Sequence, residues 1–340
     1  MKETVTITPT SEEVNEFNAY ELYNAGAESI PKLLNPLLQA TGLASVVGMS
    51  DSGKSTFLRQ LAISIALNLK EFLGFKLKGR TNKVIYVSTE DDPDSIRYTL
   101  KQQVDSILLD NENADIKSLE NIKFIFDTHN LTQNLKRKLQ QDPVDLIIID
   151  AFADVFDKEL NANTQVRAFL NTYDQIAKEH KCLIIFLHHI TKSGSQKAPS
   201  KNNIIGTQGF EAKMRVVLEI RPMKSSLNTV KLMVLKANFL KSEYKRFVYR
   251  LEMSGKLVFK KVGFYDNSED NNRESIPITK SIPKSKDPII LEQIKKLKED
   301  GLTDRDIETK LKEKGINISK STINTIALDN GYTISASLTE

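Results

Sequence analysis

The most constraining feature of this sequence is the segment Gly48-Met49-Ser50-Asp51-Ser52-Gly53-Lys54-Ser55, which matches the pattern G-x-x-x-x-G-K-[ST]. An apolar run at 43–47 precedes it, and apolar residues at helical spacing follow it. A strand, a glycine-rich turn and a helix in this order bind phosphate, because the glycines let backbone N–H groups point at phosphate oxygens. The sequence therefore predicts a phosphate-binding loop. The alternative is a glycine-rich turn that only caps an ordinary helix.

Two side chains of this loop indicate which phosphate compound binds. Lys54 offers a cation to the β and γ phosphates, and the Ser55 hydroxyl is a ligand that Mg²⁺ accepts. We therefore expect ATP together with Mg²⁺. The residues expected around the phosphates are Gly48, Ser50, Asp51, Ser52, Gly53, Lys54, Ser55 and Thr56.

Composition narrows the class of protein. The 340 residues are 40% hydrophobic and 27% charged, as in ordinary globular proteins. Cys182 is the one cysteine, which excludes an intrachain disulfide and a cysteine-rich zinc site. No apolar run approaches the roughly 20 residues that span a bilayer, and the N-terminus has no apolar signal core, so we expect a cytoplasmic protein without membrane contact. The net charge of +4 is too small to argue for nucleic acid.

Apolar runs and amphipathic stretches follow one another over most of the chain. The runs are continuous in Ile, Val and Leu, which is typical of strands buried on both faces of a parallel sheet. We therefore predict an α/β fold with a mostly parallel sheet flanked by helices, extended after residue 215 by antiparallel strands. The expected strands are 43–47, 83–88, 122–126, 146–149, 183–187, 216–220, 229–234, 246–251 and 256–259, and the expected helices are 54–69, 94–109, 131–141 and 163–179.

The chain divides into four expected parts. Residues 1–28 are polar and acidic and form an N-terminal arm, and residues 29–263 form the α/β domain. Residues 264–287 are rich in Asn, Ser, Asp, Pro and Lys, which predicts a flexible linker because this composition cannot bury a core. Helical periodicity returns in residues 288–340, which predicts a small all-α domain similar to a helix-turn-helix.

Two predicted strands end in carboxylates that suit ATP hydrolysis. The strand 146–149 ends at Asp150, which we expect to hold Mg²⁺; a helix N-cap is the structural alternative. The strand 83–88 is followed by Glu90 and Asp91, and the carboxyl ends of strands meet at the ligand crevice of an open α/β sheet. We expect Glu90 to be the base that orients the attacking water, with Asp91 as its rival.

The strand 183–187 ends in His188 and His189. Neighbouring residues of a strand point to opposite faces, so one imidazole can reach the γ phosphate while the other faces the core. A zinc site is the rival interpretation, and a chain with one cysteine and four histidines disfavours it.

These residues resemble the RecA-like ATPases, and within them the RepA type of hexameric plasmid replicative helicase, relatives of DnaB and KaiC. The resemblance extends from about Ile30 to Phe259 and rests on the P-loop, the segment 90–93, Asp150, His188-His189, Gly206 and the segment 236–239. It implies a RecA-like fold, ATP bound between the subunits of a homo-oligomeric ring hexamer, and single-stranded DNA in the central channel.

The resemblance also implies roles for single residues. Glu90 corresponds to the catalytic glutamate and His189 to the sensor of the γ phosphate. Lys236 and Arg246 lie where relatives send cations into the neighbouring subunit's ATP site, and such cations stabilise the transferring phosphoryl group. DnaB-like relatives carry a Lys-x-Arg pair on this strand, whereas the second position is Asn238, so Arg246 or a nearby lysine must supply any arginine-finger function. The alternative is a solvated edge strand.

The segment 191–208 contains Lys192, Lys197 and Lys201 among Ser, Gly and Asn, with no acidic residue. In RecA-like proteins the equivalent loop faces the central channel. Lysines on a loop suit binding to the backbone of single-stranded DNA without sequence readout. The alternative is a surface loop with solvated lysines.

The C-terminal segment offers a second possible DNA contact. Lys320, Thr322 and Asn324 would face a groove of duplex DNA if the helices form a helix-turn-helix. Residues 281–340 hold ten basic and ten acidic residues, so their net charge is zero. A three-helix module that binds a protein partner is therefore an equal alternative.

The motifs together predict an ATP-hydrolysing motor on DNA, a RepA-like replicative helicase of a plasmid or mobile element. A second hypothesis is an ATP-switched DNA-binding regulator, or an accessory protein of replication or recombination, that does not unwind DNA. A third is a clock- or signalling-type ATPase whose partners are all proteins. Strand displacement with DNA-stimulated hydrolysis separates the first hypothesis from the other two.

Overall fold

The computed structural model describes residues 16–26, 29–206, 208–223, 226, 228–266, 288–313, 316, 318–330 and 332. Most of the predicted arm 1–28 and of the predicted linker 264–287 lie outside the described residues. The described part of the arm contains α1 (Ala19–Asn24), which begins with a capping box between Asn18 and Glu21. The boundaries proposed between the four parts stay a prediction.

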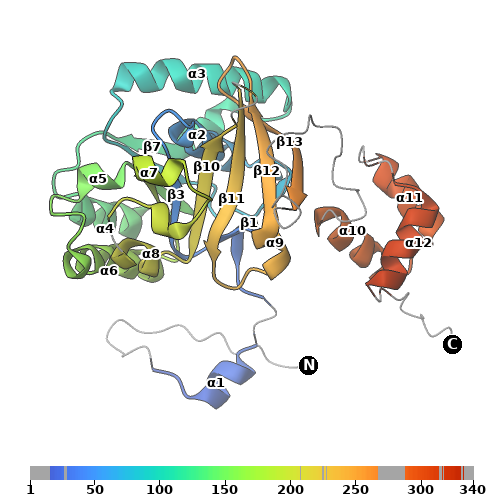
Figure 1. The fold of residues 1–340 in the computed structure, drawn as a ribbon. Coiled ribbons are helices and arrows are strands. Elements are labelled where there is room, and N and C mark those ends of the chain that lie inside the picture. The colour runs from blue at the N-terminus through green and yellow to red at the C-terminus, as the bar shows by residue number, and fades with distance from the viewer. Residues whose placement is uncertain are drawn as a thin grey trace.

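A nine-stranded sheet forms the centre of the molecule (Figure 1). Its order is β13-β12-β11-β10-β3-β9-β8-β6-β7, and the strands from β10 to β7 in this order pair in parallel while the others pair antiparallel. The strands are β3 (Gly42–Gly48), β6 (Val84–Ser88), β7 (Ile122–Ile125), β8 (Leu146–Asp150), β9 (Leu183–His189), β10 (Val216–Pro222), β11 (Thr229–Ala237), β12 (Phe247–Met253) and β13 (Phe259–Asp266). This arrangement confirms the predicted mostly parallel sheet with an antiparallel extension.

Helices cover both faces of this sheet, and each face has its own core. Side chains of α2 (Lys54–Ala66) and α3 (Pro93–Leu109) belong to one buried cluster, which also holds Val46 and Ile148. Side chains of α4 (Leu131–Gln141), α5 (Phe152–Val155), α6 (Asn163–Glu179) and α8 (Gln208–Lys213) belong to the other, with Val47 and Ile149. Successive strand residues therefore enter opposite cores, which explains the uninterrupted apolar runs in the sequence.

Short elements were not predicted from the sequence. A second sheet of order β2-β1-β5-β4 consists of β1 (Lys32–Asn35), β2 (Leu38–Gln39), β4 (Glu71–Phe72) and β5 (Phe75–Leu77). Strands of two to four residues carry too little periodicity to be recognised. The remaining short helices are η1 (Ile116–Asn121), α7 (Lys192–Ser195), η2 (Lys201–Asn203) and α9 (Ser242–Arg246).

The last strand begins where the sequence suggested that it ends. A strand over 256–259 was expected, whereas β13 starts at Phe259 and runs to Asp266, past the predicted domain end at 263. The Gln60 side chain fixes this start, because its amide bonds both the N–H and the carbonyl of Phe259, at 2.8 and 2.9 Å. A contact between residues this far apart in sequence leaves no local signal.

The C-terminal helices are α10 (Pro288–Glu299), α11 (Asp304–Glu313) and α12 (Lys320–Asp329). Ile294, Ile307, Leu311 and Ile323 are fully buried in a core of their own. A helical C-terminal region was predicted and is present. No helix in the described part of the chain is long and apolar enough to cross a bilayer.

Truncating Leu61 should destabilise the α/β domain. Leu61 lies on α2 and is 0% exposed, so Leu61→Ala leaves a cavity and should lower the free energy of unfolding by about 2–5 kcal/mol. Leu109→Ala is the control, because Leu109 is 79% exposed and its truncation should change stability by less than about 0.5 kcal/mol. Urea unfolding followed by circular dichroism measures both. Equal midpoints for the two variants would contradict this account of the core.

Candidate functional site

The predicted phosphate-binding loop joins the end of β3 to the start of α2. Gly48 lies so close to β10 that a Cβ atom there would stand 2.4 Å from the Ile220 carbonyl oxygen. Gly53 has a φ of +84°, and a Cβ there would stand 2.7 Å from the Phe259 ring. Both positions therefore require glycine, for packing at the first and for packing and conformation at the second. The first turn of α2 has no side-chain cap, which leaves its N–H groups available to an anion.

Lys54 is held inside this loop. Its side chain is buried, and Nζ donates a hydrogen bond of 2.5 Å to the Met49 carbonyl, which also accepts a bond of 2.8 Å from Ser52 Oγ. Burial lowers the pKa of Lys54, while Asp150, Glu90 and Asp51 raise it. The cation thus stands among acids and a carbonyl oxygen that a phosphate can replace.

Asp150 ends β8 and is buried beside the loop. Its Oδ2 accepts a hydrogen bond of 2.6 Å from the Tyr86 hydroxyl, while Oδ1 is buried without a partner. Burial raises the pKa of Asp150, and hydrogen bonds from Tyr86 and Ser55 lower it. A carboxylate oxygen without a donor, next to the Ser55 hydroxyl, fits the oxygen ligands that Mg²⁺ prefers. The described residues contain no cluster of three or more metal-binding His, Cys, Asp or Glu side chains.

Glu90 follows β6 and faces the same crevice. His189 Nε2 lies 3.9 Å from Glu90 Oε1. Partial burial raises the pKa of Glu90, and the nearby carboxylates of Asp150 and Asp154 raise it further. A glutamate with a raised pKa binds a proton more readily, which suits a general base.

The rival acids of this segment have other contacts. Asp91 Oδ2 lies 3.7 Å from the buried guanidinium of Arg59. Asp92 is the N-cap of α3, and its side chain accepts bonds of 2.8 Å from the N–H groups of Asp94 and Ser95. The geometry therefore favours Glu90 over Asp91 as the base.

The two histidines point in different directions. His188 lies between the rings of Phe152 and Phe210, at centroid distances of 5.0 and 4.7 Å, and its Nε2 is 2.8 Å from the Ile205 carbonyl oxygen. Burial lowers the pKa of His188 to about 4, so this imidazole is neutral at physiological pH. His189 faces Glu90, and burial and the Lys54 charge lower its pKa.

The other predicted cations lie away from this cluster. Lys236 on β11 forms an ion pair of 3.0 Å with Glu211, and Arg246 Nη2 lies 3.6 Å from Asp266 Oδ2. Lys201 also pairs with Glu211, at 3.3 Å. Contacts with a neighbouring subunit or with DNA stay a prediction for these residues. Exposed side chains among the predicted DNA contacts are those of Lys192, Lys197, Lys201, Lys320 and Asn324, while Thr322 is half-buried.

Several residues of the site had no recognised signal in the sequence. Tyr86 sits inside an apolar strand, and Arg59 sits on the buried face of α2, where its Nε donates a bond of 3.0 Å to Gln103. Thr89 Oγ1 donates to Asp154 Oδ2 at 2.5 Å and accepts from the Ala151 N–H at 2.8 Å. An arginine within an apolar helical stripe could have drawn attention to Arg59.

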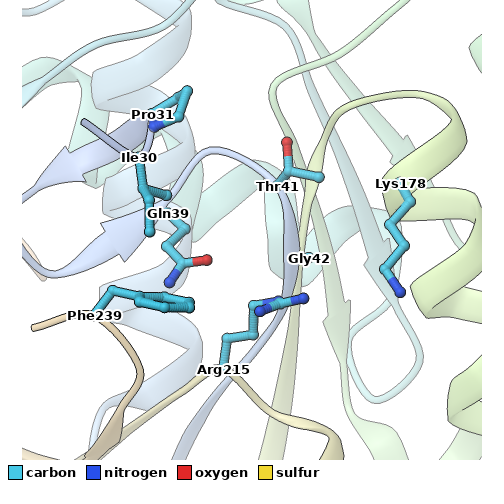
Figure 2. A pocket seen from close by; sticks show the side chains of 8 residues that line it. All are labelled: Ile30, Pro31, Gln39, Thr41, Gly42, Lys178, Arg215 and Phe239. Atoms are coloured by element: carbon cyan, nitrogen blue, oxygen red, sulfur yellow. The ribbon is translucent and has the colours of Figure 1, made fainter. Parts of the chain in front are cut away.

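A hollow of about 280 Å³ lies at the opposite end of β3, where Gly42 starts the strand. Figure 2 shows Phe239 and Gln39 on one side of it and Lys178, from α6, on the other. The strand β3 separates this hollow from the P-loop, so it does not belong to the nucleotide site.

Comparisons with known proteins agree with the fold and the loop. A family model described as an AAA domain matches residues 9–195. Among solved structures, the ATPase domain of a DnaB-like helicase matches with a TM-score of 0.51 at 13% sequence identity, and the match covers 72% of this chain and 95% of the other. No curated protein matches the chain. The predicted RecA-like P-loop fold is confirmed by the family match and the structural match.

Removing the Tyr86 hydroxyl should weaken the response to Mg²⁺. In Tyr86→Phe, Asp150 Oδ2 loses its 2.6 Å donor, and loss of such a supporting bond typically lowers metal affinity by about tenfold or more. Titration of Mg²⁺ against binding of a fluorescent ATP analogue measures the shift without turnover. Tyr98→Phe is the control, because Tyr98 is 67% exposed. An unchanged Mg²⁺ midpoint in Tyr86→Phe would refute the role assigned to this bond.

Proposed function

The chain belongs to the AAA domain family, and we propose that it is an ATP-hydrolysing motor on DNA, a replicative helicase of RepA type from a plasmid or mobile element. ATP and Mg²⁺ are its proposed cofactors. It acts as a homo-oligomeric ring hexamer in the cytoplasm, with single-stranded DNA in the central channel.

One observation supports the hydrolytic part of this proposal most strongly. Lys54, Glu90, Asp150 and His189 come from four segments of the chain and meet at the carboxyl ends of β3, β6, β8 and β9. Ligands of open α/β sheets bind at this edge. The cluster combines a phosphate cation, a general base and a metal-binding carboxylate, the set that phosphoryl transfer requires.

These residues divide the chemistry among them. The N–H groups at the start of α2 hold the phosphates, and Lys54 Nζ exchanges the Met49 carbonyl for a phosphate oxygen. Glu90 accepts a proton from the attacking water, and His189 bonds the γ phosphate. When bound between Ser55 and Asp150, Mg²⁺ neutralises charge that develops on the phosphates.

The proposed ring places a cation from each subunit at its neighbour's ATP. Arg246 supports this because its side chain is 58% exposed and its Asp266 contact is a long 3.6 Å. Lys236 would have to leave Glu211 to act in this way, since the 3.0 Å ion pair is accompanied by a 2.8 Å bond to the Glu211 carbonyl. Arg246 is therefore the better candidate of the two.

The proposed DNA contact is the lysine loop, which we define as residues 191–206. Its three lysines are exposed and project from a backbone that begins directly after the γ-phosphate sensor His189. A basic loop of this kind tracks the phosphates of single-stranded DNA. Hydrolysis sensed by His189 can thereby move the DNA contact.

The three C-terminal helices support a second candidate, an ATP-switched DNA-binding regulator or accessory protein that does not unwind DNA. Lys320 and Asn324 are exposed on α12, as groove contacts would have to be. The zero net charge of residues 281–340 argues against tight binding to duplex DNA. A footprint confined to one duplex sequence would favour this candidate over the motor.

The base assignment predicts a clean separation of binding and turnover. Glu90→Gln should bind ATP normally and hydrolyse it about 100-fold more slowly or worse, because an amide cannot accept the proton. Asp91→Asn is the matched control and should lose little activity. Lys54→Ala should lose ATP affinity. Fluorescent-nucleotide binding and phosphate release measure both properties, and normal hydrolysis by Glu90→Gln would transfer the role to Asp91.

The lysine loop should set how strongly hydrolysis responds to DNA. Single-stranded DNA should stimulate the ATPase, and replacing Lys192, Lys197 and Lys201 with glutamine should reduce the salt dependence of half-maximal stimulation by about two log–log units. The matched control replaces Lys117, Lys123 and Lys138, which are also exposed. Robust basal hydrolysis without any DNA stimulation would refute the motor.

A further inference from the structure

Strand β10 carries an ion pair on the face that is otherwise apolar. Val216, Leu218 and Ile220 enter one core, so Glu219 and Arg221 point to the other face. Glu219 is 0% exposed, and Arg221 Nε and Nη2 donate to its Oε1 at 2.8 and 2.6 Å. Glu219 Oε2 is buried with no partner. A buried pair of this kind adds little stability over an apolar pair, so stability does not account for it.

The other contacts of Arg221 all lie in the lysine loop. Nη1 donates to the carbonyl oxygens of Lys197 at 2.6 Å and Ser195 at 3.4 Å, and Nη2 lies 3.4 Å from that of Gly194. A guanidinium offers five donors in a rigid fork, so it can bind one carboxylate and several carbonyls together. Glu219 thus fixes the guanidinium, and the guanidinium fixes the loop backbone.

The loop is folded compactly around this contact. Gly194 is buried, and a Cβ there would stand 2.6 Å from Asn203 Cβ. Asn203 Nδ2 donates to the Ala198 carbonyl at 2.9 Å, and the Asn203 carbonyl accepts from the Thr191 N–H at 2.8 Å. The backbone therefore faces inward to Arg221, while the lysine side chains are exposed.

The clamped loop spans the strand that leads into the P-loop. β3 lies between β9 and β10, and Gly48 is level with His189 on one side and Ile220 on the other. The loop leaves from β9, where the Ile190 N–H donates to the Gly48 carbonyl at 3.2 Å, and Arg221 of β10 holds it on the far side. Figure 1 shows α7, the start of this loop, near β10. A shift of the P-loop strand thus acts on both attachments.

We propose that Glu219 and Arg221 form a clamp that positions the lysine loop over the end of β3, so that its contacts with single-stranded DNA follow the state of the P-loop. The clamp rests on the proposed function only for the DNA contact. Arg221 is a positioning residue, since it binds the backbone of the loop and touches neither nucleotide nor DNA in this arrangement.

Limited digestion of the full chain with trypsin tests the clamp without DNA. Cleavage after Lys197 and Lys201 reports opening of the loop, and cleavage after the exposed Lys117 is the internal reference. Arg221→Lys keeps the charge but cannot span Glu219 and the carbonyls, so loop cleavage should accelerate about tenfold, because loss of one charged hydrogen bond raises the open population by about that factor. Arg167→Lys, the same exchange on an exposed site of α6, should leave it unchanged.

A loop that is cleaved no faster in Arg221→Lys, while Lys117 is cleaved as before, would overturn the clamp. If Arg221→Lys is digested throughout, Glu219→Gln decides, since it retains the arginine and one acceptor oxygen. It should accelerate loop cleavage less than Arg221→Lys does, and wild-type cleavage rates in this variant would overturn the clamp equally.

A second measurement links the clamp to DNA. In Arg221→Lys the DNA concentration for half-maximal ATPase stimulation should rise, because less of the loop is in the binding position, while its salt dependence stays the same because no phosphate contact is removed. A defect of overall stability would lower basal turnover and leave half-saturation in place. If the wild-type enzyme shows no stimulation by DNA, the motor fails, whereas the digestion result still decides the clamp.

Discussion

Close backbone packing at two glycines determines where every other part of the nucleotide site can lie. Gly48 packs against the Ile220 carbonyl and Gly53 against the Phe259 ring, and both distances exclude a side chain. The P-loop is therefore pressed between β10 and the start of β13, which are far from it in sequence. Gln60 completes this arrangement, because its amide fixes Phe259 from the helix that the loop begins. The antiparallel part of the sheet thus supports the phosphate-binding loop directly.

Charge at the site is balanced in the absence of nucleotide by contacts within the chain. Lys54 is near Asp150, Glu90 and Asp51, and its ammonium is bound to a backbone carbonyl. Arg59 adds a buried positive charge close to Asp150. An Mg²⁺–nucleotide complex brings both signs of charge, so it can replace these contacts without leaving a buried ion unpaired. The raised pKa of Glu90 arises in the same crowded group of carboxylates.

The order of strands links this chemistry to the loop that we propose binds DNA. The strand with the P-loop has the strand of His189 on one side and the strand of Arg221 on the other. His188 adds a third attachment, because its imidazole is within hydrogen-bond distance of the Ile205 carbonyl at the end of the loop. A basic loop with three attachments to neighbouring strands can respond to changes at the nucleotide as a unit, which a freely mobile chain could not do.

The sequence alone determined the fold class, the P-loop, and the acids and histidines that end the apolar runs, because these features are local. A continuous apolar run predicts a strand buried on both sides, and the residue after it reaches the ligand edge of the sheet. Asp150, Glu90 and His189 could be named for this reason. Only the tertiary structure decided which side chains support them. Tyr86, Arg59 and the Glu219–Arg221 pair look like ordinary members of apolar strands and helices. Their roles depend on contacts with residues far away in the sequence, and such contacts exist only once the sheet has formed.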